Sequence, residues 1–256
     1  MTEQDTSQYV HFERSWGPGF YVRKQLAQAV KALHENVMMI TIAAGCPGYA
    51  IHHVVNEFHP SPSVVAECLR AGLWEKVEDG VWGGYRILDL WQLQLGIDSM
   101  RAAERKKARA AIASGTNKYV NIVHDVNDPG YYLPAEIALQ AQALHRLATM
   151  VSVLRGRPGL VPDTLIRSVT PNPGPMIRAL FISGRWDRVE EGYRIADQRD
   201  VDNAIRAVAA NAAAEAACVG AGGHRPQPLR DFITIRGVES TCSVCGTILM
   251  PDDPIH

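Results

Sequence analysis

The same pattern of apolar and polar positions occurs twice along the chain. Each occurrence begins with a short stretch of alternating apolar and polar residues, at Tyr9–Phe12 and again at Tyr119–Val123, which predicts a strand. Apolar residues then recur every three or four positions, which predicts amphipathic helices over Val22–Ala44 and Leu133–Val151. The hydrophobic pattern therefore predicts two similar units, each beginning with a strand and a long helix.

Two short helices and a pair of strands are expected after each long helix. The short helices are predicted at Tyr49–Glu57, Ser63–Ala71, Asp163–Val169 and Pro175–Ser183. The paired strands are predicted at Trp74–Val77, Tyr85–Ile87, Trp186–Val189 and Tyr193–Ile195. A strand, three helices and a two-stranded hairpin follow one another in a winged helix-turn-helix, in which the hairpin is the wing.

The residues repeat along with the pattern. Gly72–Glu78 returns as Gly184–Glu190, Gly84–Asp89 returns as Gly192–Asp197, and Ala32-Leu33-His34 has its counterpart in Ala143-Leu144-His145. A period of roughly 110 residues is that of a domain, since solenoid repeats are much shorter. The predicted fold is mainly α with small β hairpins: two tandem winged helix-turn-helix domains followed by a C-terminal Cys-x-x-Cys tail.

Four segments follow from this division. The first domain is expected over residues 1–96, a basic helical linker over 97–118, the second domain over 119–218 and a flexible tail over 219–256. The alanine-rich stretch Ala204–Ala217 predicts a helix at the end of the second domain. Gly220–Pro228 is rich in glycine and proline and is expected to be a linker.

Composition places the protein among ordinary soluble proteins. Of its 256 residues, 46% are apolar and 21% are charged, enough for two modest cores. No apolar run approaches the ~20 residues of a membrane span, and the polar start Met1–Gln8 is not a secretory signal. The odd number of cysteines, five, favours a reduced, cytoplasmic protein.

Positive charge is concentrated in the segment that joins the two repeats. The net charge of the whole chain is −1, yet Asp98–Ala113 is predicted to be a helix with a strong excess of cations. These are Arg101, Arg105, Lys106, Lys107 and Arg109. The spacing of Arg101, Arg105 and Arg109 places them on one helical stripe, which suits phosphate contacts and a solvated linker helix equally well.

The second copy has the more basic helix-turn-helix. Its arginines are Arg155, Arg157, Arg167, Arg178, Arg185 and Arg188. Because the second helix of such a motif normally enters the major groove, Pro175–Ser183 is the better candidate to contact double-stranded DNA. The first copy is more acidic, which suits pairing with a protein instead. Solvated helix faces with no partner are the simpler interpretation of both.

Trp74 and Trp186 allow two interpretations. Exposed tryptophans stack on bases in single-stranded nucleic acid sites. A tryptophan two residues after a helix-ending glycine more often closes a domain core, and we expect that role here.

The tail holds a second chemical signal. Cys242-Ser243-Val244-Cys245-Gly246 has the form of a zinc knuckle, in which two thiolates bind one metal ion. A structural zinc site requires four ligands, and the available complements are Cys218, His224 and His256. A redox pair or disulfide and an inert turn are the alternative interpretations.

Catalytic motifs are missing from the sequence. It has no glycine-rich phosphate loop, metalloprotease helix motif or nucleophile elbow, so we expect no enzyme. His52-His53 is interpreted as a core or surface pair.

The string Leu69–Val77, followed by Gly84–Asp89, resembles a block found in winged-helix proteins of actinobacteria and their phages. These are small DNA-binding or replication-initiation-related proteins. The resemblance implies a transcription regulator or replication accessory that binds double-stranded DNA, in the host cytoplasm if it is phage-encoded. It rests on structural residues and so supports the fold far more than the function.

An interaction module is the alternative function. Near-neutral net charge and poorly basic recognition helices favour a duplicated scaffold that binds a host replication or transcription factor, or forms a homodimer, without contacting DNA.

Overall fold

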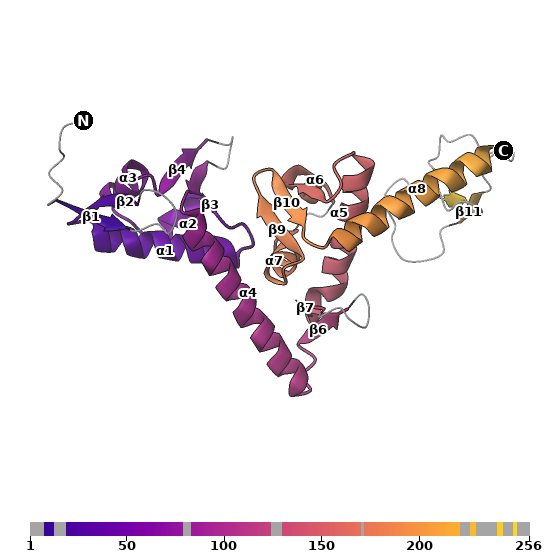
Figure 1. Ribbon diagram of the computed structural model, residues 1–256, viewed down its shortest axis with the longest axis horizontal. Helices are drawn as coiled ribbons and strands as arrows, with labels where there is room; N and C mark the ends of the chain where they lie inside the picture. The colour runs from indigo at the N-terminus through magenta and orange to yellow at the C-terminus, as the bar shows by residue number, and fades with distance from the viewer. Residues whose placement is uncertain are drawn as a thin grey trace. The chain divides into compact units, whose positions relative to one another are not determined.

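The computed structural model describes most of the chain in detail. Side chains and backbone are described for residues 8–12, 19–78, 83–123, 130–167 and 172–218, and backbone alone for 168–169, 219–220, 226–228, 240–242 and 248–249. Within these ranges the protein is mainly helical with small antiparallel β hairpins (Figure 1). The coarse fold class predicted from the sequence is confirmed.

One order of elements recurs in the two repeats. The first repeat consists of β1 (Tyr9–Phe12), β2 (Phe20–Arg23), α1 (Ala27–Ala43), β3 (Tyr49–Ile51), α2 (His52–Asn56), α3 (Pro62–Arg70), β4 (Trp74–Val77) and β5 (Gly84–Ile87). The second consists of β6 (Tyr119–Ile122), β7 (Tyr131–Pro134), a 3-10 turn (Ala135–Ile137), α5 (Ala138–Leu154), β8 (Leu160–Pro162), α6 (Asp163–Val169), α7 (Gly174–Ile182), β9 (Trp186–Val189) and β10 (Gly192–Ile195). Corresponding strands also occupy corresponding places in the sheets, with the orders β3-β5-β4 and β8-β10-β9.

Each repeat begins with a two-stranded hairpin, and here the sequence prediction was wrong. The long helices start at Ala27 and Ala138, while Val22 and Leu133, which were assigned to helices, lie in strands β2 and β7. Along β2 the residues alternate between buried and exposed, and β2 pairs with β1 in an antiparallel register. Aromatic and branched residues suit such a strand, and this period of two was missed beside the stronger helical period that follows.

The third strand of each small sheet was also missed. Residues Tyr49–Ile51 form β3, which pairs with β5, so the short helix α2 starts only at His52. A strand of three residues is too short to show a periodicity of its own. It is fixed by pairing with a strand that is distant in the chain, which only the tertiary structure can decide.

The two remaining helices are longer than predicted. Helix α4 (Leu90–Ala113) follows directly on the first repeat, and the carboxylate of Asp89 caps it by accepting a hydrogen bond from the Gln92 amide. Helix α8 (Gln198–Gly220) follows the second repeat and extends to the glycine that was assigned to a linker. The described part of the tail holds strands β11 (Pro226–Pro228), β12 (Ser240–Cys242) and β13 (Ile248–Leu249).

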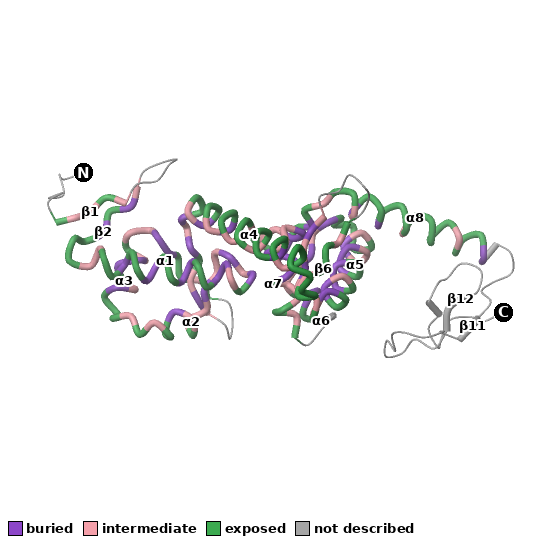
Figure 2. The backbone as a smooth tube through the Cα atoms, turned by 90° about the horizontal axis from the view of Figure 1, so that it is seen from below, coloured by how far each residue is buried: buried purple, intermediate pink, exposed green. Residues whose placement is uncertain are grey.

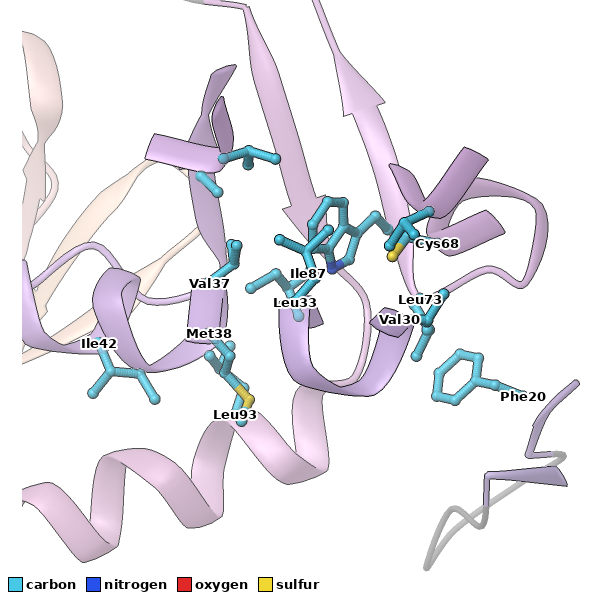
Figure 3. Close-up of a cluster of buried hydrophobic side chains, with 14 of the residues drawn as sticks. Phe20, Val30, Leu33, Val37, Met38, Ile42, Cys68, Leu73, Ile87 and Leu93 are labelled. Atoms are coloured by element: carbon cyan, nitrogen blue, oxygen red, sulfur yellow. The ribbon is translucent and has the colours of Figure 1, made fainter. Parts of the chain in front are cut away.

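The core of the first repeat gathers between α1, α3 and the sheet. Figure 3 shows Leu33, Val37 and Ile87 directed toward one another, with Leu93 of α4 approaching from below. Phe181 and Ile182 of α7 belong to the same cluster of buried side chains. The first repeat therefore shares its core with part of the second.

Packing divides the chain into two compact units that do not coincide with the repeats. One unit comprises residues 1–145 and 162–196, and the other comprises 146–161 and 197–256. In the second unit, α8 buries Val201 and Ala204 and is exposed along most of the rest of its described length (Figure 2). The domain boundaries deduced from the repeat stay a prediction.

Candidate nucleic-acid interface

Both repeats contain the same buried pair of aromatic side chains. The indole Nε1–H of Trp74 donates to Nδ1 of His34 at 3.0 Å, and Trp186 donates to Nδ1 of His145 at the same distance. The two tryptophans are 2% and 0% exposed. The expectation that they close the core is confirmed. The two histidines had been given no role, although their similar spacing from the tryptophans in both repeats is visible in the sequence.

Arg101 is held inside the fold. Its guanidinium donates to the carbonyl oxygens of Phe181 and Trp186 at 3.1 and 2.9 Å. It also forms an ion pair with Asp187 at 2.9 Å, and its side chain is only 12% exposed. The three arginines of the predicted stripe therefore have different surroundings. Arg101 joins α4 to α7 and β9, whereas Arg105 and Arg109 are exposed.

Two further arginines from the predicted set are engaged within the second repeat. Arg188 binds the carboxylate of Asp163 through two hydrogen bonds of 2.7 and 2.8 Å and lies over the ring of Tyr193. Arg185 is buried, with its guanidinium carbon 4.2 Å from the centre of the Tyr131 ring. Both guanidinium groups stabilise the repeat from within and present little charge to a partner.

Helices α4 and α7 contact each other, and both carry exposed cations. Arg105, Lys106, Lys107 and Arg109 on α4 and Arg178 on α7 are all at least partly exposed. The pKa of Lys107 is raised by its hydrogen bond with Tyr119 and by the charge of Glu104, while Arg178 opposes this rise through its own positive charge. Because such repulsion requires proximity, Lys107 and Arg178 lie close together although they are far apart in the sequence.

Helix α7 exposes its first half and buries its second. Arg178 is accessible in the first half, whereas Ala179 to Ile182 are buried. A Cβ at Gly45 would lie 2.9 Å from the Cα of Arg178, and Gly45 has a φ of 80°. Glycine is therefore required at the end of α1 both for its backbone conformation and for the close approach of α7.

Helix α3 of the first repeat offers no comparable charge. Glu67 is buried and accepts hydrogen bonds from the Arg70 side chain and, at 2.7 Å, from the Arg23 amide. Arg70 donates in addition to the carbonyl oxygen of Tyr21 at 2.8 Å. The only arginine of α3 is thus used to hold the first hairpin against the helix.

The remaining predicted cations are exposed. Arg167 of α6 lies in the first compact unit, whereas Arg155 and Arg157 lie in the second. Of the histidine pair, His52 packs edge-on against Tyr85 and His53 lies on the surface, 3.3 Å from Glu57.

The predicted zinc ligands lie outside the part of the chain whose side chains are described. These are Cys242, Cys245, His224 and His256. Across the described side chains, no group of three or more histidine, cysteine or acidic residues is positioned to hold a metal ion. The zinc site stays a prediction.

Comparisons with protein-family models, with curated proteins and with solved structures give no match for this chain. Among the described helices, none combines the length and the apolar character that crossing a bilayer requires.

Proposed function

We propose that this protein binds double-stranded DNA through the cationic surface of α4 and α7, each repeat being a winged helix-turn-helix. The order of helices and the strand orders β3-β5-β4 and β8-β10-β9 support this fold, with α3 and α7 in the place of recognition helices and β4-β5 and β9-β10 in the place of wings. A role in transcription regulation or replication fits such a protein.

The proximity of Arg178 to Lys107, on two contacting helices that both expose cations, is the observation that carries this proposal. The first half of a recognition helix is the part that meets base edges in the major groove, and Arg178 is the accessible cation of that half. Arg105, Lys106 and Arg109 then suit contacts to the phosphates beside it. Arg101, Arg185 and Arg188 support this surface from inside and are not proposed to touch DNA.

Fluorescence anisotropy with genomic and random duplexes tests the proposal. Replacing Arg105, Lys106 and Arg109 together by alanine is expected to weaken binding to all sequences. The slope of log affinity against log salt should fall by about 0.9 for each phosphate that the variant no longer neutralises. Arg178→Ala should weaken binding to the preferred sequence about 10-fold or more and relax the preference, as expected when a base-reading side chain is removed.

Lys24→Ala is the matched control, because Lys24 is exposed in the turn between β2 and α1 and belongs to neither helix of the proposed surface. It should bind DNA like the parent protein. Lack of binding by the parent protein at about 50 mM salt, where phosphate attraction is strong, would contradict the proposal.

A second function is favoured by a separate observation. Leu90, Trp91 and Leu95 on the first turns of α4 are 69%, 41% and 48% exposed. Exposed apolar side chains that cluster in this way are typical of protein interfaces. A parent protein that fails to bind DNA, but binds a purified replication or transcription factor and loses that binding on Leu95→Glu, would establish the interaction module.

A further inference from the structure

A cavity of about 250 Å³ lies in the first repeat. It is bounded by β1, by α1, by the turn before β4 and by the first turn of α4, all within one compact unit. Its walls include Lys31, His34, Glu35, Leu73 and Asp89. None of these residues belongs to the surface proposed for DNA, so the cavity requires an explanation of its own.

His34, which lines the cavity, has an unused hydrogen-bond donor. Because its Nδ1 accepts from Trp74, the neutral ring carries its proton on Nε2. The residue is 4% exposed, and Nε2 has no hydrogen-bond partner among the described residues. Burial lowers the pKa of His34, which keeps the ring neutral. A buried N–H of this kind favours a ligand that carries an acceptor.

Asp89 brings a buried carboxylate to the same cavity. It is 2% exposed, and one of its oxygens accepts from the Gln92 amide at 3.2 Å. The nearby Lys31 lies 3.9 Å from Glu35, with which it pairs at the surface. In the part of the chain that the structure describes, no cationic side chain forms an ion pair with Asp89. A buried carboxylate without a cation favours a cationic ligand.

The second repeat has a different residue at the position of Leu73, which lines the cavity. In the repeated sequence Leu73 corresponds to Arg185, and Phe20 corresponds to Tyr131. Arg185 is buried against the Tyr131 ring, so its guanidinium occupies the interior of the second repeat. Leu73 instead packs with Phe20 and Val30 in the apolar cluster, and its shorter side chain brings no charge to this position (Figure 3). The cavity of the first repeat is thus lined by a leucine at the sequence position where the second repeat carries a buried arginine.

We propose that the cavity of the first repeat binds a ligand bearing an arginine group. The guanidinium pairs with the Asp89 carboxylate, as a replacement for the charged group that Leu73 lacks. An oxygen of the same ligand accepts the hydrogen bond from His34 Nε2. Free arginine supplies that oxygen from its carboxylate, and an arginine residue in a peptide supplies it from a carbonyl group. The cavity lies just below the usual range of about 300–1,000 Å³, which suits a ligand of this size.

Calorimetry and thermal unfolding with four small molecules test this inference independently of DNA binding. L-arginine at about 20 mM is expected to raise the Tm by about 4 °C. Citrulline has a neutral group in place of the guanidinium and should give no shift. Agmatine, which lacks the carboxylate, should bind more weakly than L-arginine. Comparison of L-arginine with a blocked arginine dipeptide shows whether the natural ligand is free arginine or an arginine residue of a peptide, since the natural ligand should resemble the tighter binder. No Tm shift with any of the three guanidinium compounds, or an equal shift with citrulline, would overturn the inference.

Leu73→Arg provides the decisive variant, because it places in the first repeat the side chain that the second repeat has at the corresponding position, and its guanidinium should occupy the cavity in place of the ligand. We expect this variant to fold and to lose the response to L-arginine, whereas Leu73→Met, which keeps an apolar side chain of similar volume, should retain it. Asp89→Asn keeps an oxygen to cap α4 and should weaken L-arginine binding at least about 10-fold, as expected when one member of a buried charge pair is neutralised. An undiminished response in Asp89→Asn would contradict the proposed site even if Leu73→Arg failed to fold.

Discussion

The hydrogen bond from a buried tryptophan to a histidine on the long helix is the interaction that both repeats share most closely. It joins α1 to β4 in the first repeat and α5 to β9 in the second, at 3.0 Å in each case. Each tryptophan ring also packs beside a tyrosine of the neighbouring strand, at 5.3 Å for Tyr85 and 5.5 Å for Tyr193. One polar interaction inside an apolar core thereby fixes the position of the helix relative to the hairpin.

Replacing either tryptophan by phenylalanine is therefore expected to cost about 2–3 kcal/mol of unfolding free energy. The change removes part of a buried ring and leaves a histidine acceptor without its donor. Urea unfolding of Trp74→Phe and Trp186→Phe measures this effect. Trp91→Phe is the control, because Trp91 is 41% exposed and should change stability by no more than about 0.5 kcal/mol. Equal stability of all three variants would contradict a structural role for the pair.

At the scale of elements, the hairpin β1-β2 is held to α3 by charge. Glu67 is 1% exposed at its side chain and lies between Arg70 on its own helix and Arg23 on β2. Its pKa is lowered, chiefly by the hydrogen bond from Arg70 and further by the Arg23 amide, against the opposing effect of burial. The folded state therefore binds a proton at Glu67 less readily than the unfolded state does.

This lowered pKa predicts how stability depends on pH. The ionised Glu67 carboxylate contributes fully to the stability of the folded protein above about pH 4.3, the pKa of glutamate in the unfolded chain. This contribution is lost as the pH falls through the lower pKa of the folded state. Between pH 7 and pH 3 the parent protein should lose more stability than Glu67→Gln, which should be less stable at pH 7 by about 3 kcal/mol. Urea midpoints across this range provide the test, with Glu75→Gln, an exposed carboxylate, as the control. Parallel pH profiles for parent and Glu67→Gln would show that this carboxylate is not the cause.

At the scale of the whole molecule, α7 of the second repeat is built into the unit that contains the first. Phe181 and Ile182 lie in the core of that unit, and the Tyr193 hydroxyl donates to the Gly45 carbonyl oxygen at 2.7 Å. Arg101 adds hydrogen bonds from α4 to the ends of α7 and β9. The segment joining the repeats is thus a packed structural element as well as a carrier of positive charge.

Arg101 and Arg105 are one helical turn apart, and replacing each by alanine should affect the stability of the protein very differently. Arg101→Ala is expected to lower the unfolding free energy by about 2–4 kcal/mol, because two carbonyl oxygens and Asp187 lose a largely buried partner. Arg105→Ala should change it by no more than about 0.5 kcal/mol while weakening DNA binding. Thermal unfolding and anisotropy of the two variants separate these effects. Equal decreases in stability would contradict the division of the basic stripe into an internal and an exposed part.

The sequence by itself determined the duplication, the mainly helical fold class with small β hairpins, and the order of most elements. Helical periodicity and helix-ending glycines such as Gly72 and Gly184 are local signals, since they depend on a few neighbouring residues. Only the tertiary structure decided that β2, β3 and their counterparts are strands, because short strands are defined by distant partners. It also decided which cations are exposed. Arg101 and Arg105 are equivalent in charge and spacing, and their difference arises solely from what packs against each.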